Sequence, residues 1–135
     1  MILGFDFGMK YIGIATGNLV TKTATALTSI RATDGIPNWQ EIADLIAHWQ
    51  PSALVIGIPL NMDGSEQLLT KCAQKFANRM RQKFKLPIHL VDERLSTWEA
   101  KNQLLSRATK LREKDLLAIN ARAAAIIVEQ WLLQQ

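Results

Sequence analysis

The chain has 135 residues, a net charge of +4 at pH 7 and one cysteine, so we expect residues 1–135 to form a single domain with a substantial core. Because Cys72 is the single cysteine of the sequence, an internal disulfide and a cysteine-based metal cluster are excluded. No apolar run approaches membrane-spanning length and no signal pattern precedes the first strand, which predicts a cytoplasmic protein without a membrane partner.

The N-terminal stretch predicts a hairpin: a strand over 2–7, a turn over 8–10 and a returning strand over 11–16. Asp6 places a carboxylate inside the otherwise apolar first strand. Such a group is costly to bury unless something pairs with it. The neighbouring glycines indicate close approach by a ligand or another backbone. We therefore take Asp6 as the centre of a candidate site, in a pocket open to solvent.

The next part of the chain predicts a third strand over 23–30 and a turn over 34–37. Asn38 is placed to cap a helix that continues to Trp49, with Glu41 as its capping-box partner. Residues 53–60 form a continuous apolar run. Such a run is typical of a parallel strand covered on both faces.

A second helix is predicted over 66–84, with two rows of residues at four-residue spacing. One row should face the core and makes Cys72 a packing residue: Leu68, Cys72, Phe76 and Met80. The other row is a basic ridge on the solvent side: Lys71, Lys75, Arg79 and Lys83. The ridge is compatible with phosphate contacts and equally with a simple solvated face.

A fifth strand is predicted over 87–91, followed by Asp92 and Glu93, and the final helix over 118–133. We expect a loop over 106–115 and a buried, hydrogen-bonded His89. The order of elements predicts an α/β fold with a five-stranded mixed sheet and helices on both faces.

Acidic residues lie at or near the ends of three predicted strands, at Asp6, within 61–63 and at Asp92–Glu93. Ligands of such sheets bind beyond the carboxyl ends of parallel strands. Clustered carboxylates without histidine or cysteine favour Mg²⁺ or Mn²⁺, and two such ions support phosphodiester hydrolysis. Neighbouring strand residues point to opposite faces, so only one of Asp92 and Glu93 faces the site, and spacing alone leaves the choice open.

The charge is divided unevenly along the chain. Residues 1–70 hold three basic and six acidic residues, whereas residues 71–135 hold thirteen basic and six acidic residues. An acidic cluster beside a basic field suits an anionic polymer held over metal ions, although a basic helical surface alone has the same composition.

Three blocks of sequence resemble the YqgF family of bacterial proteins, also called RuvX-like or Holliday-junction-resolvase-like and described as pre-16S rRNA nucleases. The blocks are Asp6-Phe7-Gly8 with Gly13, then Gly57-Ile58-Pro59-Leu60-Asn61-Met62-Asp63-Gly64, and then Asp92-Glu93-Arg94-Leu95-Ser96-Thr97. The resemblance covers essentially the whole chain. It implies a ribonuclease-H-like fold and a metal-dependent nuclease that trims the 5′ end of pre-16S rRNA.

The resemblance also implies site residues. Asp6 and Glu93 are the implied metal ligands, and Asn120 occupies the position of a third acid. Three readings of Asn120 stay open: it ligates as a neutral oxygen; a nearby acid (Asp63, Glu113 or Asp115) replaces it; or the protein cuts slowly or binds without cutting.

We expect six basic residues to contact nucleic acid: Lys10, Arg94, Arg107, Lys110, Arg112 and Lys114. Pre-16S rRNA is the first expected partner and branched DNA the second, which leaves a Holliday-junction-type resolvase and a non-cutting RNA-binding assembly factor as alternatives. The oligomeric state stays open.

Overall fold

The computed structural model describes residues 1–59, 68–92 and 112–135. Within these ranges the elements are β1 (Ile2–Asp6), β2 (Tyr11–Asn18), β3 (Thr23–Thr33), β4 (Ile36–Pro37), α1 (Trp39–Trp49), β5 (Ala53–Ile58), α2 (Leu68–Phe84), β6 (Ile88–Asp92) and α4 (Glu113–Leu133). The predicted hairpin, helix–strand alternation and final helix are confirmed.

The strands form one mixed sheet in the order β4-β3-β2-β1-β5-β6. β1, β5 and β6 run parallel, so their carboxyl ends lie at one edge of the sheet, as expected. The prediction of five strands is wrong by one, because β4 lies where we expected only a turn and pairs with Ala32 and Thr33. A strand of only two residues is too short to show the alternation of apolar and polar residues by which a strand is predicted. Pro37 is tolerated in β4 because β4 is an edge strand.

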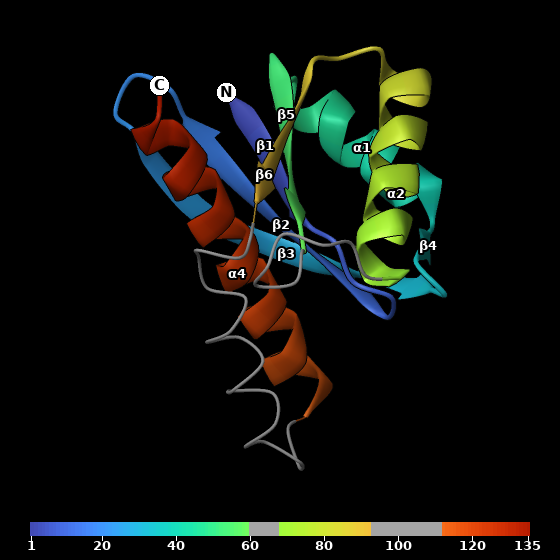
Figure 1. The fold of residues 1–135 in the computed structure, drawn as a ribbon. Helices are drawn as coiled ribbons and strands as arrows, with labels where there is room; N and C mark the ends of the chain where they lie inside the picture. Colours follow the sequence, from blue (N-terminus) through green and yellow to red (C-terminus); the bar gives the residue numbers. More distant parts are fainter. Residues whose placement is uncertain (60–67, 93–111) are drawn as a thin grey trace.

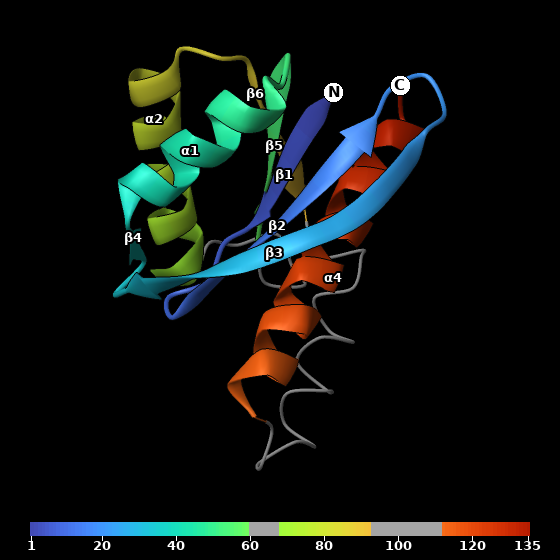
Figure 2. The ribbon, with the colours of Figure 1, turned by 180° about the vertical axis from the view of Figure 1, so that it is seen from behind.

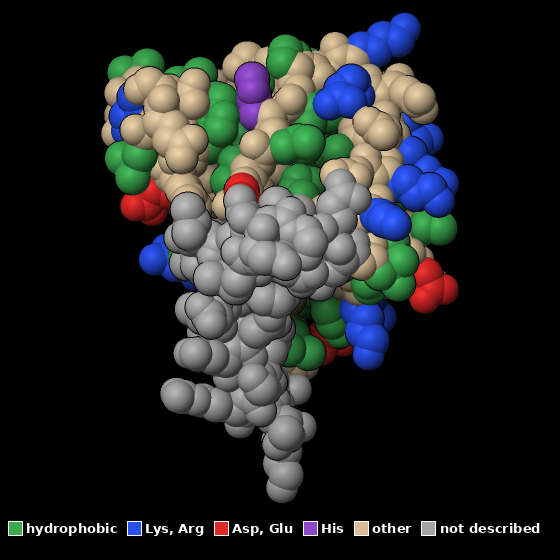
Figure 3. Space-filling view, viewed as in Figure 1, with side chains coloured by type: hydrophobic (Ala, Val, Ile, Leu, Met, Phe, Trp, Pro, Cys, Tyr) green, Lys and Arg blue, Asp and Glu red, His purple; other side chains and the backbone are tan. Residues whose placement is uncertain are grey.

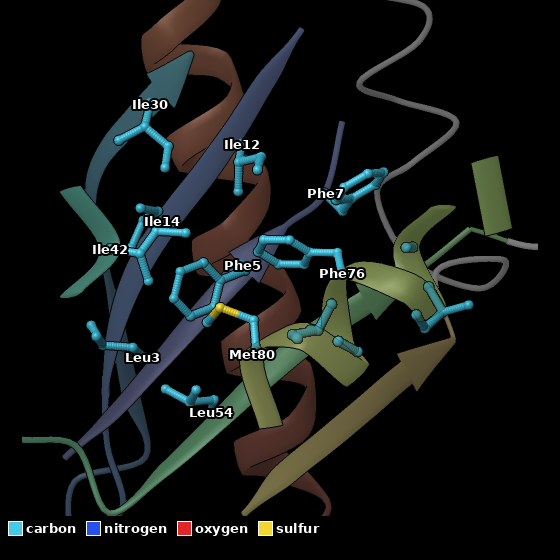
Figure 4. Packing of buried hydrophobic residues seen from close by; sticks show 14 residues of the cluster. Leu3, Phe5, Phe7, Ile12, Ile14, Ile30, Ile42, Leu54, Phe76 and Met80 are labelled. Atoms are coloured by element: carbon cyan, nitrogen blue, oxygen red, sulfur yellow. The ribbon is translucent and has the colours of Figure 1, made fainter. Parts of the chain in front are cut away.

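Helices cover both faces of the sheet: α1 and α2 lie on one side and α4 on the other (Figures 1 and 2). The α1/α2 side carries the larger core, in which the ring centroid of Phe76 on α2 lies 6.1 Å from that of Phe5 on β1 and 5.2 Å from that of Phe7, which directly follows β1 (Figure 4). β5 is buried along its whole length, as its apolar run predicts. α1 begins at the predicted cap, where the Asn38 side chain accepts a hydrogen bond from the Gln40 N–H.

Small residues form the interface between α4 and the sheet. A Cβ added at Gly4 or Gly17 would lie 1.9 Å or 2.5 Å from Val128. One at Gly13 would lie 1.9 Å from the backbone oxygen of Asn120. Because these strand positions carry no side chain, α4 can pack in close contact with the strands.

α4 is an apolar helix interrupted by charged residues such as Arg122 and Glu129, so it contains no continuous apolar run of membrane-spanning length. The helix has 21 residues, and an 18-residue window within it has a mean hydropathy of 1.4, so by length and composition alone it would suit a membrane span. Half of that window is buried inside the protein. Contact with the sheet through residues such as Ala124 and Val128 accounts for this apolar character.

Three further expectations are wrong. Leu68 is 76% exposed, although Phe76 and Met80 in the same row are buried. His89 is exposed on β6, where its ring lies 4.9 Å from Trp131, and it is no core residue. Residues 113–115 belong to α4, so the expected loop is helical in that part; residues 106–111 lie outside the described ranges.

Candidate functional site

Asp6 is the last residue of β1 and lies in a row of small residues across the sheet. Its cross-strand partners are Gly13 on β2 and Gly57 on β5, and the row continues to Ser29 on β3 and Val91 on β6. Alternation along β1 places Asp6 on the α4 face, because Leu3 and Phe5 pack on the α1/α2 face. The chain thus presents one carboxylate to α4 at the carboxyl edge of the sheet.

Asp6 is buried, at 1% exposure, which corrects the expectation of a pocket open to solvent. The residue takes part in a further polar interaction, in keeping with the cost of leaving a buried carboxylate alone. The carboxylate position is therefore an enclosed one at the sheet edge, beneath the N-terminal half of α4.

α4 brings Asn120 to the same row. The backbone oxygen of Asn120 is the atom that a Cβ at Gly13 would strike, and Gly13 is the direct neighbour of Asp6 on β2. One turn earlier, the Ser29 hydroxyl donates to the Leu117 carbonyl, which fixes the helix over this row. Asp6 and Asn120, separated by more than a hundred residues in sequence, are thus both neighbours of Gly13. We call this level of the sheet and of α4 the layer of Asp6.

The side chain of Asn120 is held in a defined orientation. It is 5% exposed, and its Nδ2 donates a hydrogen bond of 2.7 Å to the Leu116 carbonyl. A carbonyl only accepts, so the amide nitrogen must face Leu116 and the oxygen Oδ1 points away from it. The residue thereby offers a neutral oxygen, not a charge, to its surroundings.

The two acids after β6 divide between the faces. Val91 packs in the core beneath α4, and Asp92 pairs in register with Ile58, which packs in the α1/α2 core. Asp92 is therefore on the face opposite Asp6. Glu93 lies outside the described residues, so its role as the partner of Asp6 stays a prediction, and so does the role of Asp63 as a substitute.

The expected nucleic-acid contacts are described only in part. Lys10 is exposed in the β1–β2 turn, at the same edge of the sheet as Asp6. Arg112 and Lys114 are exposed at the start of α4. Arg94, Arg107 and Lys110 lie outside the described residues.

Glu113 has a structural partner on the neighbouring strand. Its carboxylate accepts from Arg31 on β3, and this hydrogen bond and ion pair raise the pKa of Arg31 above its usual value. This pairing makes Glu113 an anchor between α4 and β3 more than a free substitute for a third acid. Asp115 is half-buried in the first turn of α4.

Asp6 and Asn120 supply oxygen donors, which are the ligands that Mg²⁺ and Mn²⁺ prefer. Across residues 1–59, 68–92 and 112–135, no group of three or more His, Cys, Asp or Glu forms a metal cluster. The described residues therefore offer two kinds of oxygen ligand that suit a hard divalent ion, the carboxylate of Asp6 and the amide oxygen of Asn120.

Sequence reasoning missed the other members of the row, Ser29 and Gly57, and the contact of Asn120 with Gly13. A signal was present: Gly13 sits opposite Asp6 once the hairpin register is drawn. A glycine opposite a buried acid indicates that another backbone approaches there.

Comparison with known proteins places this chain in a family. The family model described as "RuvX: Holliday junction resolvase" matches residues 1–134. A protein of Haemophilus ducreyi named "Putative pre-16S rRNA nuclease" is 53% identical over 131 residues, which is 96% of this chain and 94% of that protein. A protein of Coxiella burnetii with the same name is 50% identical over 133 residues, covering 98% and 92%.

Solved structures of resolvases share the fold. Fowlpox virus resolvase with Holliday junction DNA has a TM-score of 0.54 at 13% identity, covering 98% of both chains. Thermus thermophilus RuvC with a Holliday junction substrate has a TM-score of 0.51 at 13% identity, covering 98% of this chain and 93% of that one. At such identities the likeness concerns the fold alone, and it confirms the predicted ribonuclease-H-like sheet with helices on both faces. The match of the family model over residues 1–134, with relatives at 53% and 50% identity, shows that this protein belongs to the RuvX family.

Proposed function

We propose that this protein is a metal-dependent endonuclease that hydrolyses phosphodiester bonds and processes the 5′ end of pre-16S rRNA in the cytoplasm. The observation that carries the proposal is the buried carboxylate of Asp6, held at the carboxyl edge of the sheet in one layer with Asn120. Membership of the RuvX family and the names of the relatives support the same reaction and substrate.

In this proposal Asp6 and Glu93 hold Mg²⁺ or Mn²⁺, and Oδ1 of Asn120 supplies a neutral ligand in place of a third acid. When bound, such ions lower the pKa of water and stabilise the leaving oxygen of a phosphodiester. The protein's part is to fix its oxygens beforehand. The hydrogen bond from Asn120 to Leu116 and the close seat of α4 on Gly13 do this without rearrangement.

Exposed basic residues complete the site in the proposal. Lys10 follows Asp6 by four residues, at the same sheet edge, and meets the phosphate backbone there. Lys114 lies six residues before Asn120 on α4, about 9 Å along the helix axis. Arg112 extends this basic surface, and we assign Arg94, Arg107 and Lys110 to it as well.

The test is cleavage of a pre-16S 5′-leader fragment in Mg²⁺ or Mn²⁺ by the wild type and by Asp6→Asn. We expect the variant to lose on the order of a thousandfold in rate, because removal of a charged metal ligand costs several kcal/mol of transition-state stabilisation. Asp44→Asn, an acid exposed on α1, is the matched control and should cleave like the wild type. Equal cleavage by wild type and Asp6→Asn would overturn the proposal.

A second function is favoured by one observation, the amide at Asn120. An RNA-binding assembly factor that does not cut would keep the fold and the basic surface and lose one negative charge at the ion site. Binding that weakens steeply with salt, without any ion-dependent cleavage, would support it. Cleavage that disappears in Asp6→Asn would exclude it. A four-way DNA junction offered beside the RNA decides between ribosomal RNA processing and junction resolution.

A further inference from the structure

A cavity opens on the face of the sheet opposite α4, at the same carboxyl edge. It measures about 120 Å³ and lies between the β3–β4 turn, the start of α1 and the N-terminal half of α2. The residues that line it are Phe7, Asp34, Gly35, Ile36, Trp39, Cys72, Lys75, Phe76 and Arg79. The function proposed above leaves all of them without a role.

The interior of the cavity is aromatic. Phe7 and Phe76 are buried, with ring centroids 5.2 Å apart, and Trp39 stacks on Phe76 at 5.7 Å and 17° between ring planes. An apolar cavity of ~150 Å³ is known to hold one benzene ring, so this volume suits a single flat ring. A larger ligand must keep its remainder outside.

The rim of the cavity is charged. Lys75 and Arg79 are exposed one helical turn apart on α2, and Asp34 is exposed in the opposite turn. Within the described ranges, neither cation is paired with a carboxylate. Both belong to the basic ridge of α2, where Lys and Arg side chains gather at the right of Figure 3. Cations beside an aromatic interior match a ligand that carries a flat ring and a phosphate.

The cavity lies at the same edge of the sheet as the candidate ion site. Phe7 directly follows Asp6, the last residue of β1, and packs in the α1/α2 core, so the two side chains lie on opposite faces of the same sheet edge. A polymer chain that passes Asp6 can therefore reach the cavity around that edge. A strand of nucleic acid has this form, with a ring on every residue.

We propose that this cavity binds an unpaired base of a single-stranded segment of the substrate, with Lys75 and Arg79 on the adjoining phosphates. The inference rests on the proposed nuclease function and adds a requirement for unpaired nucleotides beside the cleavage site. An unpaired base is needed because a base within a duplex keeps its ring stacked between neighbours, out of reach of Phe7, Trp39 and Phe76. Asp34 accepts a hydrogen bond from an N–H of the base.

The test measures binding of fluorescein-labelled 12-nucleotide RNA, single-stranded and as a blunt duplex, by fluorescence anisotropy with the full chain. We expect Lys75→Gln/Arg79→Gln to weaken single-strand binding about tenfold and to lower the slope of log affinity against log salt by about 1.4, since two phosphate contacts are lost. Duplex binding should change by less than about twofold. The matched control, Arg81→Gln/Lys85→Gln, removes the same charge at two exposed positions, one in the last turn of α2 and one directly after it, neither of which lines the cavity, and it should leave the preference for single strands unchanged.

A second arm tests the rings. Trp39→Leu should weaken single-strand binding about tenfold, whereas Trp39→Phe keeps an aromatic ring in the cavity wall beside Phe76 and should bind within about threefold of the wild type. Inorganic phosphate and a free mononucleotide, added as competitors, distinguish a site for a nucleic-acid strand from a site for a small ligand. RNA binding that is unchanged by millimolar concentrations of either competitor supports a site for a strand.

Loss of single-strand preference in the cavity variants, with duplex binding intact, supports the inference. Equal effects of the cavity pair and the control pair would overturn it, as would displacement of the RNA by a free mononucleotide at micromolar concentration. Either result leaves the nuclease proposal standing if cleavage still depends on Asp6. If the wild type binds no RNA or DNA, the nuclease proposal itself falls.

Discussion

The two faces of the sheet are built from side chains of different size. Toward α1 and α2 the strands present large apolar groups, such as Phe5 and Ile56, which pack around Phe76. Toward α4 they present glycine at Gly4, Gly13 and Gly17. Large side chains stabilise a fold by burying area, whereas glycine allows a helix backbone to approach a strand. The α1/α2 face therefore supplies most of the stability, and the α4 face positions the buried polar groups.

The largest expected effect on stability comes from the α1/α2 face. Phe5→Ala should lower the free energy of unfolding by about 4 kcal/mol, because it removes a fully buried ring and leaves a cavity beside Phe76. Urea denaturation measures this. Val20→Ala, at a position 91% exposed in the β2–β3 turn, should stay within about 0.5 kcal/mol of the wild type. A similar loss in both variants would refute the assignment of the core to this face.

On the α4 face, a single methyl group should have an unusually large effect. Gly13→Ala should destabilise by about 3 kcal/mol, because the new Cβ meets the backbone of Asn120, which moves only with the whole helix. Gly17→Ala is the matched variant. Its Cβ meets the side chains of Val128 and Leu132, which can rotate, so we expect a destabilisation of about 1 kcal/mol there. Equal melting curves for the two variants would mean that α4 is not seated on Gly13.

The amide of Asn120 permits a comparison of charge at constant shape. Asn120→Asp should lower stability by about 2 kcal/mol in EDTA, because the carboxylate cannot donate to Leu116 and adds a negative charge in the layer of Asp6. Mn²⁺ should recover much of this loss. Thermal unfolding in EDTA and in Mn²⁺ measures both terms. If Asn120→Asp lost the same stability with and without Mn²⁺, residue 120 would not be part of an ion site.

The smallest expected effect tests how α1 begins. Asn38→Ala should cost about 1 kcal/mol, because its side chain caps the Gln40 N–H, whereas Asn38→Gly should cost only a few tenths. No side-chain cap bonds the start of α4 at Arg112, so Arg112→Ala should leave stability nearly unchanged. A larger loss from Arg112→Ala than from Asn38→Ala would reverse this assignment.

Much of the fold follows from sequence pattern. The apolar run of β5, the cap at Asn38 and the acid within β1 each express a local rule, and each was placed correctly. Two residues of β4 and the exposure of His89 were not predictable, because an edge position depends on which strands lie beside it. Leu68 likewise lies at a helix end, where periodicity no longer fixes burial.

The candidate site was predictable in part. The cost of burying a carboxylate identifies Asp6, whereas strand spacing alone does not choose between Asp92 and Glu93, and only the family resemblance points to Glu93. The register of β6 against β5 decides the face of Asp92, and register is a property of paired strands that no single segment contains. The contact between Asn120 and Gly13 depends in the same way on how α4 crosses the sheet.

The most direct test of the account is the affinity for Mn²⁺, measured by calorimetry on the wild type, Asn120→Asp and Asp6→Asn, each confirmed as folded. The account predicts the tightest binding for Asn120→Asp, intermediate binding for the wild type and at least a tenfold loss for Asp6→Asn. Equal affinity of the wild type and Asp6→Asn would contradict the claim that the carboxylate of Asp6 holds the ion.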